Sequence, residues 1–241
     1  MKFSCSVFAG VFLHLACISQ SSVQQPDSLL NTESVSNLRQ IYLNEIGDNA
    51  QIYHGSEYIR NGQKAIGFPY FESDNMLSGS IYYQGVEYPQ RNLFYDLVSD
   101  VIISNNFPRN AQISLSPDKA DSFTIGTRVF IHLYSNKLNG LPRDGYYEQL
   151  YSGDPGVFVK REKKLVSGTG SDETKYIQYN HYYIKLKNVY YEIEGKNTLL
   201  DLLKDKQDEL RKYIHTNKLN FKKNLESSVV LSTIYYSQIK H

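Results

Sequence analysis

Hydrophobic and polar residues alternate through the middle of the chain, and a period of two residues is typical of β-strands. The alternation runs from residue 64 to residue 195, where short runs rich in Tyr, Ile, Val and Phe are interrupted by Gly, Pro, Asn and Asp. The pattern predicts strands at residues 93–95, 101–104, 112–115, 128–133, 146–151, 157–165 and 176–179. We expect these strands to form one antiparallel sheet.

Two segments have the pattern of tight β-hairpins. In residues 81–88, Gln84 and Gly85 stand at the turn, and glycine supplies the positive φ that such a turn needs. In residues 182–193, a shift of the strand pairing by one residue would turn the apolar side chains of the pairs named next toward water. The register of this hairpin is therefore strongly specified. With a two-residue turn at Lys187 and Asn188, the apolar pairs are Leu186 with Val189, Ile184 with Tyr191, and Tyr182 with Ile193.

The period changes to that of a helix after residue 195. Thr198 is a suitable N-cap for a first helix, and a second helix is predicted to begin after Asn224. A further amphipathic helix is predicted over residues 33–47. The fold class expected is α+β: an antiparallel β-meander sheet with an N-terminal helix and a C-terminal helical pair packed on it. We expect a single domain over residues 33–241, β-rich at 64–195 and helical at 198–240.

The first residues have the pattern of a secretory signal peptide over residues 1–19. Lys2 precedes an apolar run, and small side chains stand before Gln20, where we expect cleavage. Cleavage after Ser21 is nearly as consistent with the pattern. A lipid anchor at Cys17 is less favoured, because His14 stands where an aliphatic residue is usual. Residues 20–32 are polar and predict a disordered leader.

Composition and charge narrow the classes of function. The 241 residues carry a formal net charge of +1, whereas a nucleic-acid-binding protein usually has a clear basic excess. Both cysteines lie in the predicted signal peptide, so the mature chain would have no disulfide and no thiol chemistry. No later stretch has the length and hydrophobicity of a membrane-spanning helix. We therefore expect an exported protein with no nucleic acid partner and no transmembrane span in the mature chain.

Three stretches resemble a type of uncharacterised exported protein, periplasmic or of the envelope, that is common in Bacteroidota. They are Leu93-Phe94-Tyr95-Asp96-Leu97-Val98, Tyr146-Tyr147-Glu148-Gln149-Leu150-Tyr151-Ser152-Gly153, and the predicted helix from Leu199 that ends at Asn217-Lys218-Leu219-Asn220-Phe221. The resemblance covers most of the chain after about Ile52. It implies export to the periplasm or outer envelope, and it implies no activity and no site residues.

Motifs of known chemistry are sparse in this sequence. The histidines are isolated from one another, so no closely spaced pair of zinc ligands exists, and there is no nucleophile elbow or phosphate-binding loop. Residues 116–119 spell SxxK, but Pro117 and Asp118 after a predicted strand indicate a type I turn. We expect no metal and no cofactor. Acid–base chemistry would have to use carboxylates, for which the close pairs are Glu72 with Asp74, Asp96 with Asp100, and Asp118 with Asp121.

Tyrosine is the conspicuous residue, with 21 copies. Doublets at 82–83, 146–147, 182–183 and 190–191 place one ring on each face of a strand, so one ring of each could line an exposed binding face. A half-buried structural role is the simpler alternative. The candidate binding residues are Tyr83, Tyr147, Tyr183, Tyr190 and Asp96, the last being a carboxylate among apolar neighbours that must either pair or point outward.

A charged run at residues 160–164 has two interpretations. It could contact phosphate on an anionic envelope surface, but it more closely fits a charged edge strand that resists edge-to-edge pairing. The leading hypothesis for function is a non-catalytic module that binds another envelope protein or component through a Tyr-rich sheet surface. Whether the chain is an enzyme is left open, and a protein without catalytic activity is favoured. The alternatives are a hydrolase of envelope material with a carboxylate site, and a carrier of lipid or another hydrophobic ligand.

Overall fold

The computed structural model describes residues 37, 38, 41, 52, 55–60, 64–106, 111–168 and 173–240. The chain divides into two units, residues 1–47 and 48–241, and each is described by itself. In the first unit the described residues Asn37, Leu38 and Ile41 are helical and exposed. The predicted signal peptide, the leader and the rest of the predicted helix at 33–47 lie outside the described residues.

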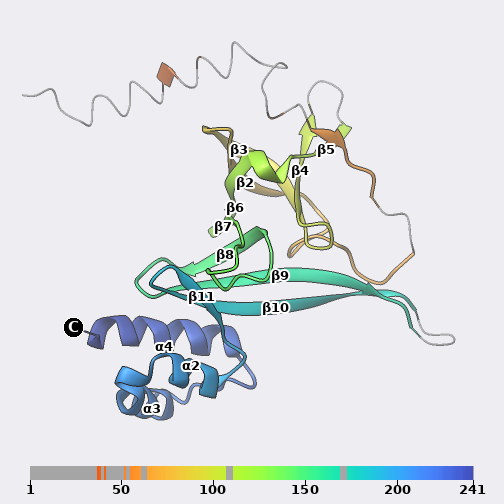
Figure 1. The fold of residues 1–241 in the computed structure, drawn as a ribbon. Coiled ribbons are helices and arrows are strands. Elements are labelled where there is room, and N and C mark those ends of the chain that lie inside the picture. Colours follow the sequence, from red (N-terminus) through yellow and green to blue (C-terminus); the bar gives the residue numbers. More distant parts are fainter. Residues whose placement is uncertain are drawn as a thin grey trace, which may run out of the picture. The chain divides into compact units, whose positions relative to one another are not determined.

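The second unit contains an antiparallel sheet to which eleven described strands belong (Figure 1). Their order across the sheet is β1-β5-β4-β3-β2-β6-β7-β8-β9-β10-β11. The strands are β1 (Ser56–Glu57), β2 (Leu77–Tyr83), β3 (Val86–Asp96), β4 (Val101–Asn106), β5 (Ala111–Ser114), β6 (Ala120–Ile125), β7 (Arg128–Leu133), β8 (Gly145–Tyr151), β9 (Gly156–Val166), β10 (Lys175–Leu186) and β11 (Val189–Glu192).

The predicted antiparallel sheet is confirmed, but the order of its strands differs from that of a simple meander. From β6 to β11 each strand pairs with the next one along the chain. The chain after β5, however, does not pair β6 with β5; it passes through a 3₁₀ turn at Pro117–Lys119 and places β6 beside β2. The strand β6 was not predicted, although Ala120, Phe123 and Ile125 are its buried residues.

Both predicted hairpins have the expected turns, and the second hairpin has the expected register. Gln84 and Gly85 have φ of 49° and 78°, and Lys187 and Asn188 have φ of 50° and 64°, which is the positive-φ pair of a type I′ turn. In the second hairpin Leu186 lies opposite Val189 and Ile184 lies opposite Tyr191, as predicted. Ile184 and Ile193 are buried, but Tyr191 is largely exposed because β11 is the last strand of the sheet.

The sheet is curled, as hydrogen bonds between segments that are far apart in the strand order show. The backbone N–H of Lys163 in β9 donates to the carbonyl of Leu97, just after β3, at 2.9 Å. The segment before β2 lies along the same seam: Phe71 N–H donates to Tyr95 O at 2.8 Å, and Ile66 N–H donates to Thr174 O at 2.8 Å. These bonds bring the chain before β2 and the end of β3 against β9 and the start of β10.

Aromatic side chains fill the inside of this curl. Phe123 and Phe130 stack with ring centroids 4.7 Å apart, and the ring of Tyr95 meets both edge-on at 5.1 and 5.2 Å. Tyr146 approaches Phe123 at 5.0 Å, and Phe71 approaches Phe130 at 5.1 Å. Such offset and edge-to-face contacts are the favourable geometries for aromatic packing. The curl is therefore a packed core built of rings.

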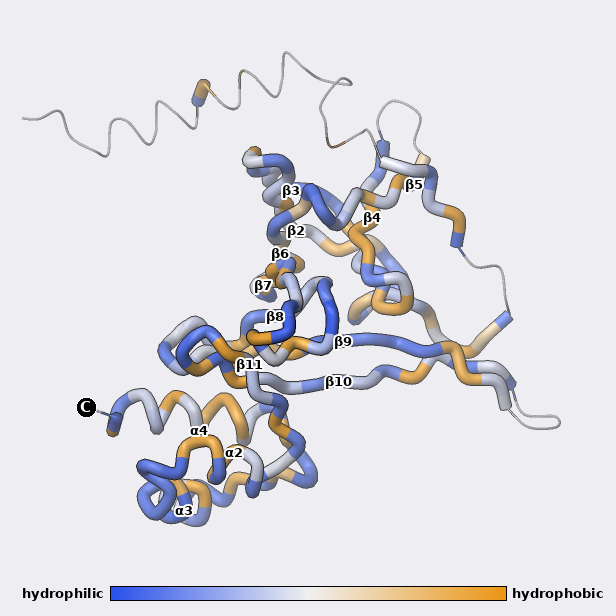
Figure 2. Tube along the Cα trace, viewed as in Figure 1, coloured by the Kyte–Doolittle hydropathy of each residue, from blue (hydrophilic) through white to orange (hydrophobic). Residues whose placement is uncertain are grey.

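Three helices cover one face of the sheet near β8–β11: α2 (Lys196–Leu202), α3 (Gln207–Thr216) and α4 (Leu225–Ile239) (Figure 1). Hydrophobic positions recur along α4 (Figure 2). Val157 and Ile184 of the sheet are buried in one cluster with Leu199, Leu210 and Val229 of the helices.

The predicted start of a helix after Asn224 is confirmed, whereas the prediction of Thr198 as an N-cap is wrong. Asn224 caps α4 by accepting from the N–H of Ser227 at 3.2 Å. Thr198 lies inside α2 rather than before it, and its hydroxyl bonds to the backbone of Gly195. The single helix expected after Thr198 is interrupted by a 3₁₀ turn at Lys204–Lys206, so it forms α2 and α3. Among the described helices, none has the length and hydrophobicity needed to cross a membrane.

Candidate functional site

The four tyrosines proposed as an exposed binding face are buried. Tyr83, Tyr147, Tyr183 and Tyr190 expose between 0% and 8% of their surface. The last three form a cluster with Leu141 and Phe158 on the face of β8–β11 opposite the helices. The expectation that they form an accessible surface is therefore wrong, because the connection between β7 and β8 covers that face and Tyr190 N–H donates to Asn139 O at 2.8 Å. The doublets do place one ring on each face, but the rings left exposed are those of Tyr82 and Tyr191, at 40% and 41%, and not those of the predicted binding residues.

Asp96, the fifth candidate, is buried and partnered through hydrogen bonds. Its Oδ1 accepts from the backbone N–H groups of Val98 at 2.8 Å and Ser99 at 3.3 Å, and its Oδ2 accepts from the Tyr58 hydroxyl at 2.9 Å. The carboxylate thus closes the turn between β3 and β4. The structure does not bring it together with the four tyrosines of the predicted site.

The charged run at residues 160–164 is not an edge strand. It belongs to β9, and all five of its residues pair with β10. The ladder between β9 and β8 ends at Val159, and beyond it the other side of the run is held by the bond from Lys163 N–H to Leu97 O. Lys160 and Arg161 are buried on opposite faces of the strand, with exposed fractions of 2% and 5%. The interpretation of this run as an edge strand is therefore wrong. The alternation of residues along a strand does not show whether one neighbour or two will pair with it. Two buried cations in one strand each need a partner.

Lys160 is held by a compact set of polar atoms. Its Nζ donates to Asp100 Oδ2 at 2.5 Å and to Tyr146 O at 3.0 Å, and Tyr95 donates its hydroxyl to Asp100 Oδ1 at 2.6 Å. Burial lowers the pKa of Lys160, and the charge of Asp100 opposes that shift. Gly145 leaves the room this pair needs, since a side chain there would overlap both charged groups. The pair links the turn after β3 to β8 and β9.

Arg161 belongs to a larger network whose centre is Glu148 of β8. Glu148 is 2% exposed, and its two oxygens accept from Arg128 Nε, from Arg128 Nη2 at 3.1 Å and from Arg161 Nε at 2.5 Å. Arg161 Nη2 also donates to Glu226 Oε2 at 2.7 Å, and Arg128 Nη1 lies 3.4 Å from Glu72 Oε1. The network therefore joins β7, β8 and β9 to the first turn of α4.

The electrostatics favour the charged forms of both arginines. Burial by itself would lower the pKa of Arg161, but the charges and hydrogen bonds of Glu148 and Glu226 outweigh it, so the pKa lies above its ordinary value. The pKa of Arg128 is raised mainly by its hydrogen bond to Glu148, against a smaller effect of burial. Exposure increases along the network, since the side chains of Arg128 and Glu226 are 34% and 31% exposed.

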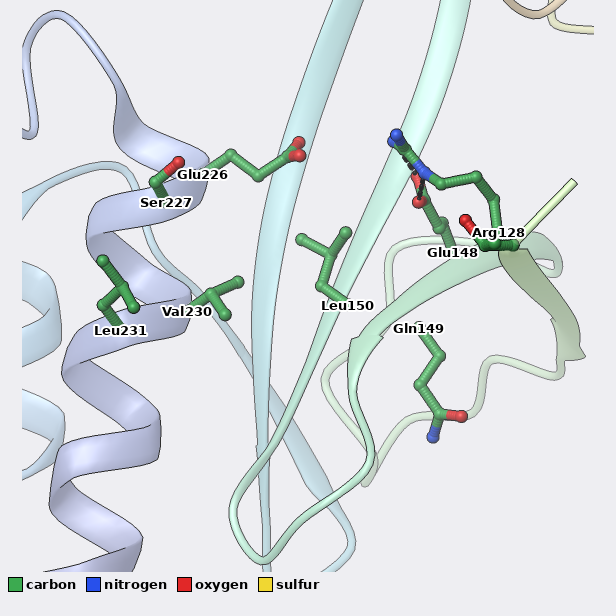
Figure 3. Close-up of a pocket in the computed structure, with 9 residues that line it drawn as sticks. Arg128, Glu148, Gln149, Leu150, Glu226, Ser227, Val230 and Leu231 are labelled. Carbon is green, nitrogen blue, oxygen red and sulfur yellow. Dashed lines mark hydrogen bonds and ion pairs between the residues drawn. The ribbon is translucent and has the colours of Figure 1, made fainter.

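These more exposed members line a groove of about 420 Å³ between the sheet and α4 (Figure 3). Figure 3 shows Glu226 directed from the helix toward the strands, with Leu150 of β8 and Val230 of α4 pointing toward each other. Leu150 lies at an irregularity where the pairing of β8 with β9 shifts register between Gln149 and Tyr151. Such bulges redirect side chains and are frequent beside functional sites. The lining consists of Thr127, Arg128, Glu148, Gln149, Leu150, Glu226, Ser227, Val230 and Leu231.

The groove combines a charged part with an apolar part. In the charged part, Glu148 and Glu226 both accept hydrogen bonds from Arg161. The arrangement suits the binding of a charged group beside an apolar one. No group of three potential metal ligands occurs within the residues that the structure describes.

The carboxylates that the sequence suggested as close pairs have different partners in the structure. Glu72 lies beside Arg128, whereas Asp74 pairs with Arg60 at 3.2 Å. Asp96 accepts from Tyr58, whereas Asp100 pairs with Lys160. Asp118 accepts from the Ser116 hydroxyl within its own turn.

Sequence reasoning missed Glu148, Arg161 and Glu226. A signal was present: Glu148 shares a strand face with Tyr146 and Leu150, and Arg161 shares one with Val157 and Val159. A charged residue at an inward position of an apolar face predicts a buried partner. The identity of that partner depends on the pairing of the strands.

Comparisons of the chain with protein-family models, with curated proteins and with solved structures gave no match.

Proposed function

We propose that this chain is an exported, non-catalytic binding module and that a segment of an envelope protein binds in the groove between β8 and α4. The observation that supports this most directly is a network of ion pairs that is buried at Glu148 and reaches the groove at Arg128 and Glu226. A buried ion pair is seldom more stabilising than well-packed apolar residues of similar size. A role in recognition gives such a network a reason to be retained.

The charge of the network favours a cationic group on the partner. Three carboxylates, Glu72, Glu148 and Glu226, face two guanidinium groups, Arg128 and Arg161, so the formal charge of the cluster is −1. Glu226 accepts through Oε2 from Arg161 and from Tyr182, at 2.7 and 3.3 Å. Its other oxygen can accept a donor from a lysine or arginine of the partner.

The other wall of the groove favours an apolar residue beside that cation. Leu150, Val230 and Leu231 line it, and Leu231 is a large apolar side chain that is 41% exposed. Covering such a surface provides a favourable term of roughly 25 cal/mol for each Å² of apolar area removed from water. The partner segment is thus expected to present an apolar side chain next to a basic one.

The two alternative functions have less support. A hydrolase needs a carboxyl group that can donate a proton, and both groove carboxylates are paired with arginine. A carrier needs an open interior, whereas the inside of the curled sheet is filled by Tyr95, Phe123 and Phe130. Export itself rests on the signal-peptide pattern of residues 1–19 and on the resemblance to exported proteins of the Bacteroidota. Its test is the N-terminal mass of the chain recovered from an envelope fraction.

A photo-crosslinking amino acid at Leu231 tests the proposal in cells that express the full chain in its natural envelope. Leu138, an apolar residue that is 85% exposed and does not line the groove, provides the matched control position. We expect a discrete cross-linked partner from position 231 and none of the same mass from position 138. Glu226→Gln, which keeps the size of the side chain and removes its charge, is expected to weaken the product. The same product from both positions, or no product from position 231, would refute the proposal.

A further inference from the structure

A second, smaller cavity lies beside the turn between β3 and β4. Its volume is about 200 Å³, and it is bordered by the chain before β2, by that turn, and by facing residues of β9 and β10. Apolar and aromatic side chains form most of the wall, namely those of Tyr58, Ile59, Pro69, Val98, Leu165 and Tyr176. This cavity shares no lining residue with the groove beside α4.

The one charged residue of this wall is Asp96, whose side chain is buried while the residue still borders the cavity. A carboxylate offers about four acceptor positions. Three hydrogen bonds occupy Asp96: two backbone N–H groups on Oδ1 and the Tyr58 hydroxyl on Oδ2. One acceptor position therefore remains on Oδ2.

Within the described part of the chain, no ion pair joins Asp96 to a cation. The charge of Asp96 acts on Lys163, where it opposes the lowering of the lysine pKa by burial, but Lys163 Nζ donates to Phe68 O at 3.0 Å and to Tyr70 O at 2.6 Å. Arg60 pairs with Asp74. A buried carboxylate that has no cation in direct contact is less well compensated than one in an ion pair, even when it is hydrogen-bonded. A cation that enters the cavity would be stabilised by this charge.

We propose that the cavity binds a primary ammonium group on an aliphatic stem, with the carboxylate of Asp96 as its counter-ion. The apolar wall, with Ile59 and Val98 exposed at its rim, would contact the stem. The rings of Tyr58 and Tyr176 offer π faces, which attract a cation.

The hydrogen bonding at Asp96 selects an ammonium over a guanidinium. Arginine binds a carboxylate best through two parallel hydrogen bonds, one to each oxygen. Oδ1 already accepts two backbone donors, so only a single point of contact is left on Oδ2. The size is also suitable: at roughly 30 Å³ for each water-sized group, a cavity of 200 Å³ holds about six such groups. The lysine side chain has five heavy atoms.

A chemical-shift titration of the purified chain with small probes tests the assignment. The probes are Nα-acetyl-lysine methylamide, the norleucine analogue that has the stem without the ammonium, the arginine analogue, and n-butylamine. We expect the lysine probe to bind at least about tenfold more tightly than the norleucine probe, a factor that corresponds to about 1.4 kcal/mol. The arginine probe is expected to bind more weakly than the lysine probe.

The fourth probe separates two sources of the ligand. Butylamine binding as tightly as the lysine probe would indicate a free amine, and much weaker binding would indicate a lysine within a polypeptide. Either result agrees with the proposal. Equal binding of the lysine and norleucine probes, or no titration shift from either, would overturn it.

Variants locate the binding in this cavity. Asp96→Asn removes the charge but keeps an oxygen for the two backbone donors, and we expect a loss of affinity of at least about tenfold. Val98→Phe fills the mouth without changing Asp96, so it remains informative if Asp96→Asn fails to fold. Asp121→Asn, at an exposed carboxylate of β6, controls for the loss of one negative charge. Unchanged binding in Val98→Phe, or an equal loss in Asp121→Asn, would contradict the proposal.

Discussion

The central ion pair of the groove network makes a quantitative prediction about stability. Glu148→Leu leaves Arg161, which is 5% exposed, without its closest carboxylate, and Arg161→Met leaves Glu148, which is 2% exposed, without its most buried cation. Removing one partner of a buried ion pair costs about 3–5 kcal/mol when the other charge is left uncompensated. Because Arg161 keeps Glu226 and Glu148 keeps Arg128, we expect a loss near the lower end of this range, about 3 kcal/mol, for each single variant. For a unit of this size each single variant should lower the melting temperature by roughly 10 °C.

The double variant is expected to be far less destabilised than the sum of the two single variants. With both central charges removed, the remaining charged groups are Arg128, Glu226 and Glu72, which are 34%, 31% and 51% exposed and can be solvated by water. Replacing a whole buried pair by apolar residues is often neutral or stabilising by about 1–4 kcal/mol. The pair should therefore show a coupling free energy of several kcal/mol in a double-mutant cycle.

Urea unfolding of the wild type, the two single variants and the double variant measures this coupling. The m-value must stay constant across the four proteins, so that a change in midpoint reports stability alone. Additive losses in the double variant would refute the reasoning, since they would mean that the two charges are not energetically coupled. Single-variant losses below about 1 kcal/mol would refute it too, because that is the range of exposed ion pairs.

Three further predictions concern other sites. Burial lowers the pKa of His132 below its ordinary value of about 6.5, so the unfolded chain binds this proton more tightly. Stability should thus fall as the pH drops below about 6.5, and His132→Phe should reduce that slope in urea titrations between pH 7.5 and 5.5; an unchanged slope would contradict the assignment. Gly145→Ala should cost at least about 1–3 kcal/mol, since Gly145 has φ of 139° and a side chain would overlap Asp100 and Lys160. Gly126→Ala, at a φ of 57° with open space around it, is the control and should cost about 1 kcal/mol, so equal losses would refute the overlap. Asn224→Ala should destabilise by about 1 kcal/mol by removing the cap of α4, and a melting temperature equal to that of the wild type would show that the cap is dispensable.

The local features of the fold could be predicted from the sequence because they depend on neighbouring residues. The hairpin register at Leu186 and Val189 follows from the alternation of apolar residues and from a turn that tolerates positive φ. The cap at Asn224 follows from the chemistry of one side chain next to a helix start. The pairing of β6 with β2 was not predictable in this way, since β5 and β2 are both antiparallel neighbours that the pattern allows.

The candidate sites depended on contacts between distant parts of the chain. The alternation shows that Tyr147 and Tyr183 have one face in common, but only the connection that crosses that face decides that both rings are buried. In the same way, Asp96 was recognised as a carboxylate that needs a partner, while its partner Tyr58 comes from 38 residues earlier.

The sequence by itself determined the β-rich middle, the two tight turns and the helical end of this protein, because hydrophobic period, turn residues and caps act over a few positions. The tertiary structure alone decided that β9 lies inside the sheet and that Arg161 meets both Glu148 and Glu226. The physical reason is that a charged residue at an inward position shows in the sequence that it needs a partner. Which residue becomes that partner depends on the curl of the sheet and the placement of α4, and both result from many long-range contacts.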